Sequence, residues 1–171
     1  DFYEVGAYYI PSMITDWKKL EKSVPVDKIQ SLECGSTVAA SDDCYFEVIG
    51  PLELNSDDDN DNSMVIRFNA NGKTVLFTGD MQFAEEESLI SHGVDLKCDI
   101  LKVGNHGNPD ATSLAFAKNT APKYAFITMD RSVDSDSANK RVTNYLRDAD
   151  IYITDEADIG YVAKIARDGK I

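Results

Sequence analysis

Two short loops carry side chains that could bind a metal ion. Asp80 follows the apolar stretch 75–77 and a Thr-Gly pair, and His106 lies between small residues after the stretch 99–103. Ligand sites in α/β proteins lie where strands end. Carboxylate and imidazole groups are ligands for zinc and similar ions. We therefore predict that Asp80 and His106 are metal ligands at neighbouring strand ends.

These two side chains do not complete a site, because zinc sites contain three or four ligands. The other histidine, His92, lies at the end of a polar helix, where its side chain would interact favourably with the helix dipole. The three cysteines, at positions 34, 44 and 98, are widely spaced, and we interpret them as isolated buried thiols. Taken singly, Asp80 could instead form a turn, and His106 could be an ordinary surface residue.

The composition describes an acidic globular protein. The chain has 171 residues and a formal net charge of −13, and we expect residues 1–171 to form a single domain. An acidic surface repels phosphate, which argues against general affinity for nucleic acids, although bound metal ions would reverse the field locally. The chain contains no stretch of roughly 18 apolar residues, so we expect no membrane contact from this segment. It starts without methionine, and we expect further sequence upstream.

The apolar pattern predicts a β-rich first half and a second half in which strands and helices alternate. In the first half we expect strands at 8–10, 26–32 and 45–49, and a helix at 15–21. In the second half we expect strands at 64–68, 74–77, 99–103, 124–128, 151–154 and 161–165, and helices at 82–91, 112–118 and 138–148. Asn71-Gly72 predicts a hairpin turn, and Asp110 is the expected cap of the second helix. Such alternation indicates a layered α/β fold.

The run 55–63 is rich in aspartate and asparagine. We interpret it as a solvated loop, because polar runs of this kind normally form surface connections. A calcium-binding surface module built on residues 57–61 is the alternative. The spacing of an EF-hand fails there, because the run has neither a central glycine nor a closing glutamate.

Four motifs occur in an order that resembles a known family. They are DNDNSMVIRF at 59–68, GKTVLFTGD at 72–80, DILKVGNHG at 99–107 and PKYA at 122–125. Together they resemble the metallo-β-lactamase-like domain of ComEC-type competence proteins over residues 45–155. The resemblance implies a four-layer αββα sandwich, of which this chain would be the incomplete, C-terminal half.

The resemblance also implies a metal site and a reaction. Asp80 matches the aspartate that bridges two zinc or manganese ions in the complete protein, and His106 matches a late histidine ligand, so the site in this chain would be partial or empty. Water activated by the ions would attack a phosphodiester or another ester. In the ComEC branch the substrate would be DNA during uptake. The resemblance leaves open an extracytoplasmic domain of a membrane protein or a free soluble protein.

Three departures from the family pattern suggest an alternative. The principal motif, His-x-His-x-Asp-His, is absent, and the chain alone is expected to be inactive. Asn105 replaces the first histidine of the late loop; we predict that it assists catalysis by donating a hydrogen bond. Residues 132–137 stand where the family has His-Pro. The alternative is therefore an inactive binding or structural module.

Partners follow from the incomplete fold. The exposed face should pair with the missing N-terminal half or with a second copy of the chain. A nucleic acid or a small phosphodiester would be the substrate.

Overall fold

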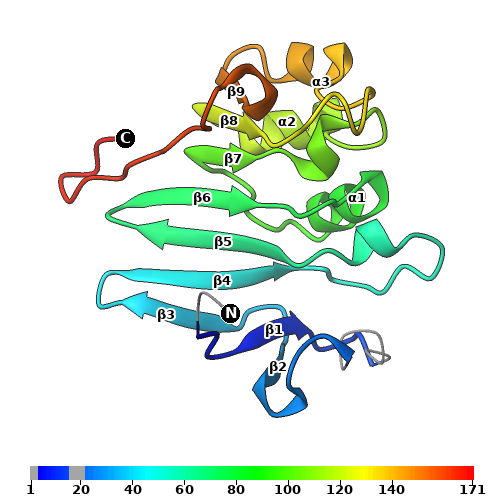
Figure 1. Cartoon of the computed structure of the whole chain (residues 1–171), viewed down its shortest axis with the longest axis vertical. Helices are drawn as coiled ribbons and strands as arrows, with labels where there is room; N and C mark the ends of the chain where they lie inside the picture. The colour runs from blue at the N-terminus through cyan, green and yellow to red at the C-terminus, as the bar shows by residue number, and fades with distance from the viewer. Residues whose placement is uncertain (1–3, 16–21) are drawn as a thin grey trace.

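A seven-stranded mixed sheet forms the centre of the molecule. The computed structural model describes residues 4–15 and 22–171. The strand order is β3-β4-β5-β6-β7-β8-β9, in which β3 to β6 are antiparallel and β6 to β9 are parallel (Figure 1). The strands are β3 (Thr37–Ser41), β4 (Cys44–Gly50), β5 (Val65–Ala70), β6 (Lys73–Phe77), β7 (Ile100–Lys102), β8 (Tyr124–Ile127) and β9 (Asp150–Ile153).

The hairpin between β5 and β6 forms as predicted. Asn71 and Gly72 both have positive φ angles, 51° and 72°, which a two-residue turn matching the strand twist requires. The strands expected at 45–49, 64–68, 74–77, 99–103, 124–128 and 151–154 are confirmed with shifted ends. β3 was not predicted.

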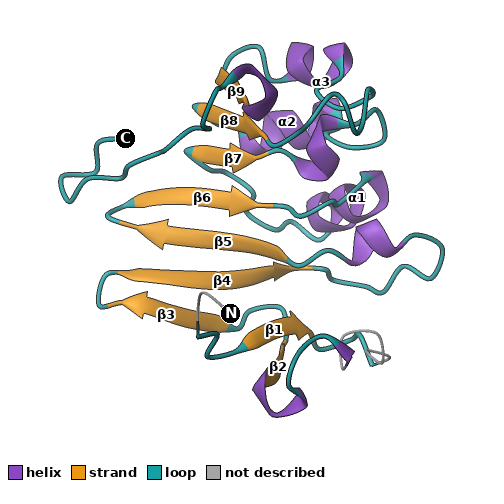
Figure 2. Cartoon of the chain, in the orientation of Figure 1, coloured by secondary structure: helices purple, strands orange, loops and turns teal. Residues whose placement is uncertain are grey.

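Three helices connect the parallel strands: α1 (Phe83–Ser91), α2 (Leu114–Thr120) and α3 (Lys140–Tyr145). All three lie on the same side of the sheet (Figure 2). Between them and the sheet lies the hydrophobic core, in which Leu76, Leu89, Leu101 and Phe116 are fully buried. The seven-stranded sheet and these helices thus form two layers.

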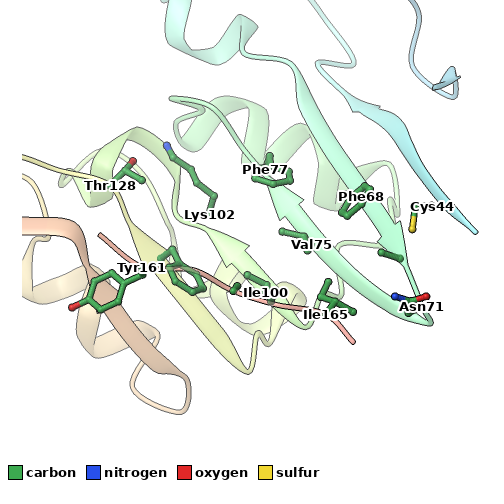
Figure 3. A pocket seen from close by; sticks show the side chains of 13 residues that line it. Cys44, Phe68, Asn71, Val75, Phe77, Ile100, Lys102, Thr128, Tyr161 and Ile165 are labelled. Carbon is green, nitrogen blue, oxygen red and sulfur yellow. The ribbon is translucent and has the colours of Figure 1, made fainter. Parts of the chain in front are cut away.

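The opposite face of the sheet is only partly covered. Phe46 stacks on Phe68 with ring centroids 4.6 Å apart, and both side chains belong to this face. A groove of about 520 Å³ runs over β6, β7 and β8, and residues 161, 163 and 165 of the C-terminal segment line its other side (Figure 3). Tyr161 packs edge-on against Tyr152, with centroids 5.1 Å apart. The strand predicted at 161–165 is wrong, because this segment contacts the face through side chains and pairs with no strand of the described chain.

A small separate sheet lies near the N-terminus. Its two parallel strands are β1 (Tyr8–Pro11) and β2 (Ile29–Leu32). The strand predicted at 26–32 is correct only in its second half, because a 3-10 turn (Val26–Lys28) comes first. The helix expected at 15–21 falls on residues 16–21, which lie outside the described part of the chain.

The sequence predicts that the acidic run 55–63 is a solvated loop, but part of this run is buried. Asp61 and Asn62 are buried within a 3-10 turn (Asp59–Asn62). One carboxylate oxygen of Asp61 accepts hydrogen bonds from the backbone N–H groups of Gln82 and Glu85 at the start of α1. Asp61 therefore caps α1 from a distant position in the sequence.

Other local predictions also need correction. Ser113, and not Asp110, caps α2, because its hydroxyl accepts the N–H of Phe116. The helix predicted at 138–148 is limited to α3. Cys98 is buried as expected, whereas Cys34 is exposed and Cys44 is half-buried. Within the described residues, no helix has both the length and the apolarity to cross a bilayer.

Replacing the distant cap tests its role in stability. We expect Asp61→Ala to lower the free energy of unfolding by about 1–3 kcal/mol, because two backbone donors lose their acceptor in a buried place. Urea unfolding followed by circular dichroism measures this loss. Asp59→Ala is the matched control, since Asp59 is exposed in the same turn and should change stability by less than about 0.5 kcal/mol. Equal losses would contradict the capping role.

Candidate metal centre

The fold brings the two predicted metal ligands together. β6 and β7 are parallel neighbours, so the loops that follow them leave the sheet at the same edge. Asp80 lies in the first loop and His106 in the second, within the turn Gly104–Gly107. The Nε2 atom of His106 is 3.4 Å from Oδ1 of Asp80. Both side chains are about half exposed, and an ion could reach them from solvent.

A hydrogen bond orients the imidazole ring. The Nδ1 atom of His106 contacts the carbonyl oxygen of Thr128, at the end of β8. A backbone carbonyl only accepts hydrogen bonds, so Nδ1 carries a proton, and Nε2 is the ring nitrogen that faces Asp80. Metal-binding histidines are commonly held in this way by a second partner.

The backbone at His106 has an unusual conformation. Asn105 and His106 both have positive φ angles, 41° and 53°, which non-glycine residues rarely adopt. Such a conformation persists only where the surroundings determine it strongly. Here the N–H of Ala138 donates to the carbonyl of His106 over 3.0 Å. The N–H of Asn108 donates to the carbonyl of Asn105 over 2.8 Å.

The Asp80 loop is packed tightly against Ser63. The Ser63 hydroxyl accepts the backbone N–H of Asp80 over 3.0 Å. Gly79 has a φ of 55°, and a Cβ atom there would lie 2.7 Å from the Cβ of Ser63. Ser63 belongs to the motif at 59–68, but its contact with Asp80 could not be predicted, because a side chain 17 residues away gives no local signal.

Lys102 is a further charged residue of the site that sequence reasoning missed. Its ammonium group donates to the carbonyl of Gly79 over 2.9 Å and lies 3.8 Å from Oδ1 of Asp80. The side chain stands at the end of the groove on the partly covered face, near Thr128 (Figure 3). Burial lowers the pKa of Lys102, and the charge of Asp80 opposes this shift. The single lysine thus places a positive charge beside the candidate ligand.

The side-chain amide of Asn105 forms a hydrogen bond with another side chain of the protein. The side chain is 8% exposed, and its amide Nδ2 donates to a carboxylate oxygen of Asp110 over 2.9 Å. The other oxygen of Asp110 accepts a hydrogen bond from Gln82. The donation of a hydrogen bond by Asn105 to a substrate stays a prediction.

The donor set is that of a partial site. In the described ranges, no group of three or more His, Cys, Asp or Glu side chains is placed to hold a metal ion. The other histidine, His92, ends α1 and contacts the carbonyl of Ser88 through Nδ1 at 2.8 Å. Asp80 and His106 suit a metal ion in type and orientation, but further ligands would have to come from outside these ranges.

Comparison with solved structures defines the class of fold. The chain superposes on a protein from Parabacteroides distasonis described as a metal-dependent hydrolase, with a TM-score of 0.53 and 16% identity, over 87% of this chain and 64% of that one. It also superposes on a variant of the CmlA β-hydroxylase, with a TM-score of 0.54 and 10% identity, over 87% of this chain and 38% of that one. The fold is that of metallo-β-lactamase-type hydrolases, which confirms the α/β class predicted from the sequence.

Comparison of sequences narrows the resemblance to competence proteins. The chain is 38% identical over 81 residues to the competence protein ComA of Neisseria gonorrhoeae and 30% identical over 86 residues to the ComE operon protein 3 of Bacillus subtilis. It is 31% identical over 87 residues to the recombination protein 2 of Haemophilus influenzae. These matches cover 47–51% of this chain and 11–12% of each relative. No family model matches. The resemblance to ComEC-type proteins is confirmed, and the chain spans about a tenth of their length.

The tight packing at Gly79 leads to a test of the Asp80 loop. We expect Gly79→Ala to destabilise the chain by about 2–4 kcal/mol, because the new methyl group meets Ser63 and the backbone becomes strained. Gly72→Ala is the control, since Gly72 also has a positive φ but nothing within 4 Å of a Cβ. It should cost about 1–2 kcal/mol. Equal losses in urea unfolding would show that the contact with Ser63 is unimportant.

Proposed function

We propose that this chain carries part of the metal centre of a metal-dependent hydrolase that cleaves phosphodiesters during DNA uptake. The approach of His106 Nε2 to within 3.4 Å of Asp80 is the observation that carries the proposal. The similarity to the competence protein ComA and to the ComE operon protein 3 supports the link to DNA uptake. The fold shared with a metal-dependent hydrolase supports the reaction class.

The residues present suit a divalent ion on chemical grounds. Asp80 and His106 would hold it, because a carboxylate and a neutral imidazole with a free Nε2 are ligands for zinc and manganese. A bound ion would supply Lewis acidity and lower the pKa of water at the site. A complete protein of this type would hold two such ions.

The other residues of the chain position these groups. Thr128 holds the proton on Nδ1 of His106, and Ser63 fixes the backbone of Asp80. Lys102 places a positive charge 3.8 Å from Asp80, and a phosphate group approaching the site would be attracted by it. This local charge matters because the chain as a whole carries −13.

The alternative is a binding or structural module without catalytic activity. The side chain of Asn105 favours it, because this amide is bound to Asp110 and an amide cannot act as a general acid. The absence of a third metal-binding side chain at the site, among residues 4–15 and 22–171, favours it as well.

The metal content of the protein distinguishes the proposed hydrolase from the inactive binding or structural module. We expect the protein extended by its natural upstream sequence to hold about two ions, whereas this chain alone should hold fewer, as measured by elemental analysis after dialysis. In the extended protein, Asp80→Ala and His106→Ala should lower the content and remove phosphodiesterase turnover. His92→Ala is the control and should do neither. An extended protein without metal would favour the inactive module.

We further propose that the partly covered sheet face binds the missing N-terminal half of the fold or, in its absence, a second copy of the chain. The exposed aromatic side chains on this face support the proposal, because large exposed apolar patches mark interaction surfaces. Sedimentation velocity of the chain alone should detect dimers that dissociate on dilution. Phe46→Asp should weaken the association, while Leu54→Asp, at an exposed residue beside α1, should not. A monomer at every concentration would contradict binding between copies.

A further inference from the structure

The loop after His106, residues 108–113, is held by the start of α3. The N–H of Ala138 donates to the carbonyl of His106 over 3.0 Å, and the N–H of Asn139 donates to the carbonyl of Gly107 over 2.9 Å. Asn139 also caps α3 with its side chain. The two residues directly before α3 therefore hold the backbone from which this loop begins, and Asn139 also caps the helix.

Arg141, one position into the same helix, binds the rest of the loop. Its guanidinium group donates to three backbone carbonyls, those of Pro109 (2.8 Å), Ala111 (2.6 Å) and Thr112 (3.2 Å). The guanidinium also lies 5.2 Å from the ring centre of Phe83 and 5.1 Å from that of Tyr145. A planar group with five fixed donors suits several carbonyls and two aromatic rings at once, whereas a lysine would not.

Glu86 binds the opposite side of the same backbone. The side chain is 1% exposed, and its two oxygens accept the N–H groups of Thr112 and Ser113. Burial raises the pKa of Glu86, while these donors and the charge of Arg141 oppose the shift. The buried carboxylate of Glu86 thus accepts hydrogen bonds from backbone N–H groups, and the guanidinium of Arg141 donates hydrogen bonds to backbone carbonyls of the same segment. Thr112 is held between them at a φ of 55°.

The loop transmits this restraint to Asn105 and, through it, to the candidate ligand His106. Asp110 lies in its middle and accepts the side-chain amide of Asn105 over 2.9 Å. Asn105 and His106 are the two neighbouring residues in the left-handed conformation. The contact of Asp110 with Asn105 and that of the Ala138 N–H with the His106 carbonyl are among the interactions that offset the strain of these two residues.

We propose that Arg141, together with Glu86, is a positioning residue that fixes the 109–113 backbone and through it the orientation of Asn105 and His106. The proposal concerns the site of the proposed function but needs no bound ion. It therefore stands or falls separately from metal binding.

Nuclear magnetic resonance of the chain labelled with ¹⁵N-histidine provides the main test. In the unsubstituted chain, Nδ1 of His106 should carry a proton because of its bond to Thr128. Arg141→Met should give His106 a mixture of tautomers, while His92, which is also bound through Nδ1, keeps its signals. Amide exchange at Thr112 and Ser113 should become at least about tenfold faster, because the loop opens without the charged donor.

Two further variants separate positioning from stability. Arg141→Lys should restore the His106 signals only in part, because a compact ammonium group lacks the planar spread of donors with which the guanidinium reaches three carbonyls. Arg131→Met is the control, since Arg131 forms an ion pair with Asp155 (3.5 Å), and it should leave His106 unchanged. A fall in melting temperature in Arg141→Met without any change at His106 would overturn the proposal.

Asp110→Ala decides the question if Arg141→Met fails to fold. Asp110 is exposed, so its removal should leave the fold intact. We expect faster exchange of the Asn105 side-chain amide and altered ring signals of His106. Unchanged signals from both residues would overturn the proposal.

Discussion

The parallel hydrogen bonding of β6 to β7 is the constraint on which the candidate site depends. It aligns Phe77 with Lys102, so the two following loops leave the sheet side by side. Without this register, Asp80 and His106 would have no reason to meet, since 26 positions separate them in the sequence. The same register places the side chain of Lys102 beside Asp80, and it places the Thr78 hydroxyl where it donates to the carbonyl of Lys102.

Local sequence predicts those parts of the fold that are determined locally. The Asn71-Gly72 turn and the buried strands have their own signals, namely residues that tolerate positive φ and runs of apolar side chains. β3 has the composition TVAAS and is mostly exposed, so it has no apolar alternation to detect. The buried state of Asp61 depends on α1, which begins about 20 residues later, and composition alone cannot reveal it. The segment 161–165 has the pattern of a strand, but pairing also needs a neighbouring strand with free hydrogen-bonding groups.

The candidate site likewise contains residues that local sequence predicts and residues that it does not predict. Asp80 and His106 could be predicted because glycine-containing loops after strands are readable in the sequence. Ser63, Lys102 and Thr128 could not, since each acts through a contact with a residue far away in the chain. Whether Asp80 and His106 hold metal in the complete protein stays a prediction, as does the role of Asn105.

The hydrogen bonding of two buried carboxylates explains how the described fold holds the two candidate ligands in place. Asp61 and Glu86 are buried carboxylates, and both are bound chiefly by backbone N–H groups. Such charge-assisted bonds fix the backbone as well as stabilising the charge. Asp61 thereby fixes the start of α1, directly after Asp80, and Glu86 fixes the loop after His106. The acidic character of the chain is therefore in part structural, because two of its carboxylates determine the conformation of the segments that follow Asp80 and His106.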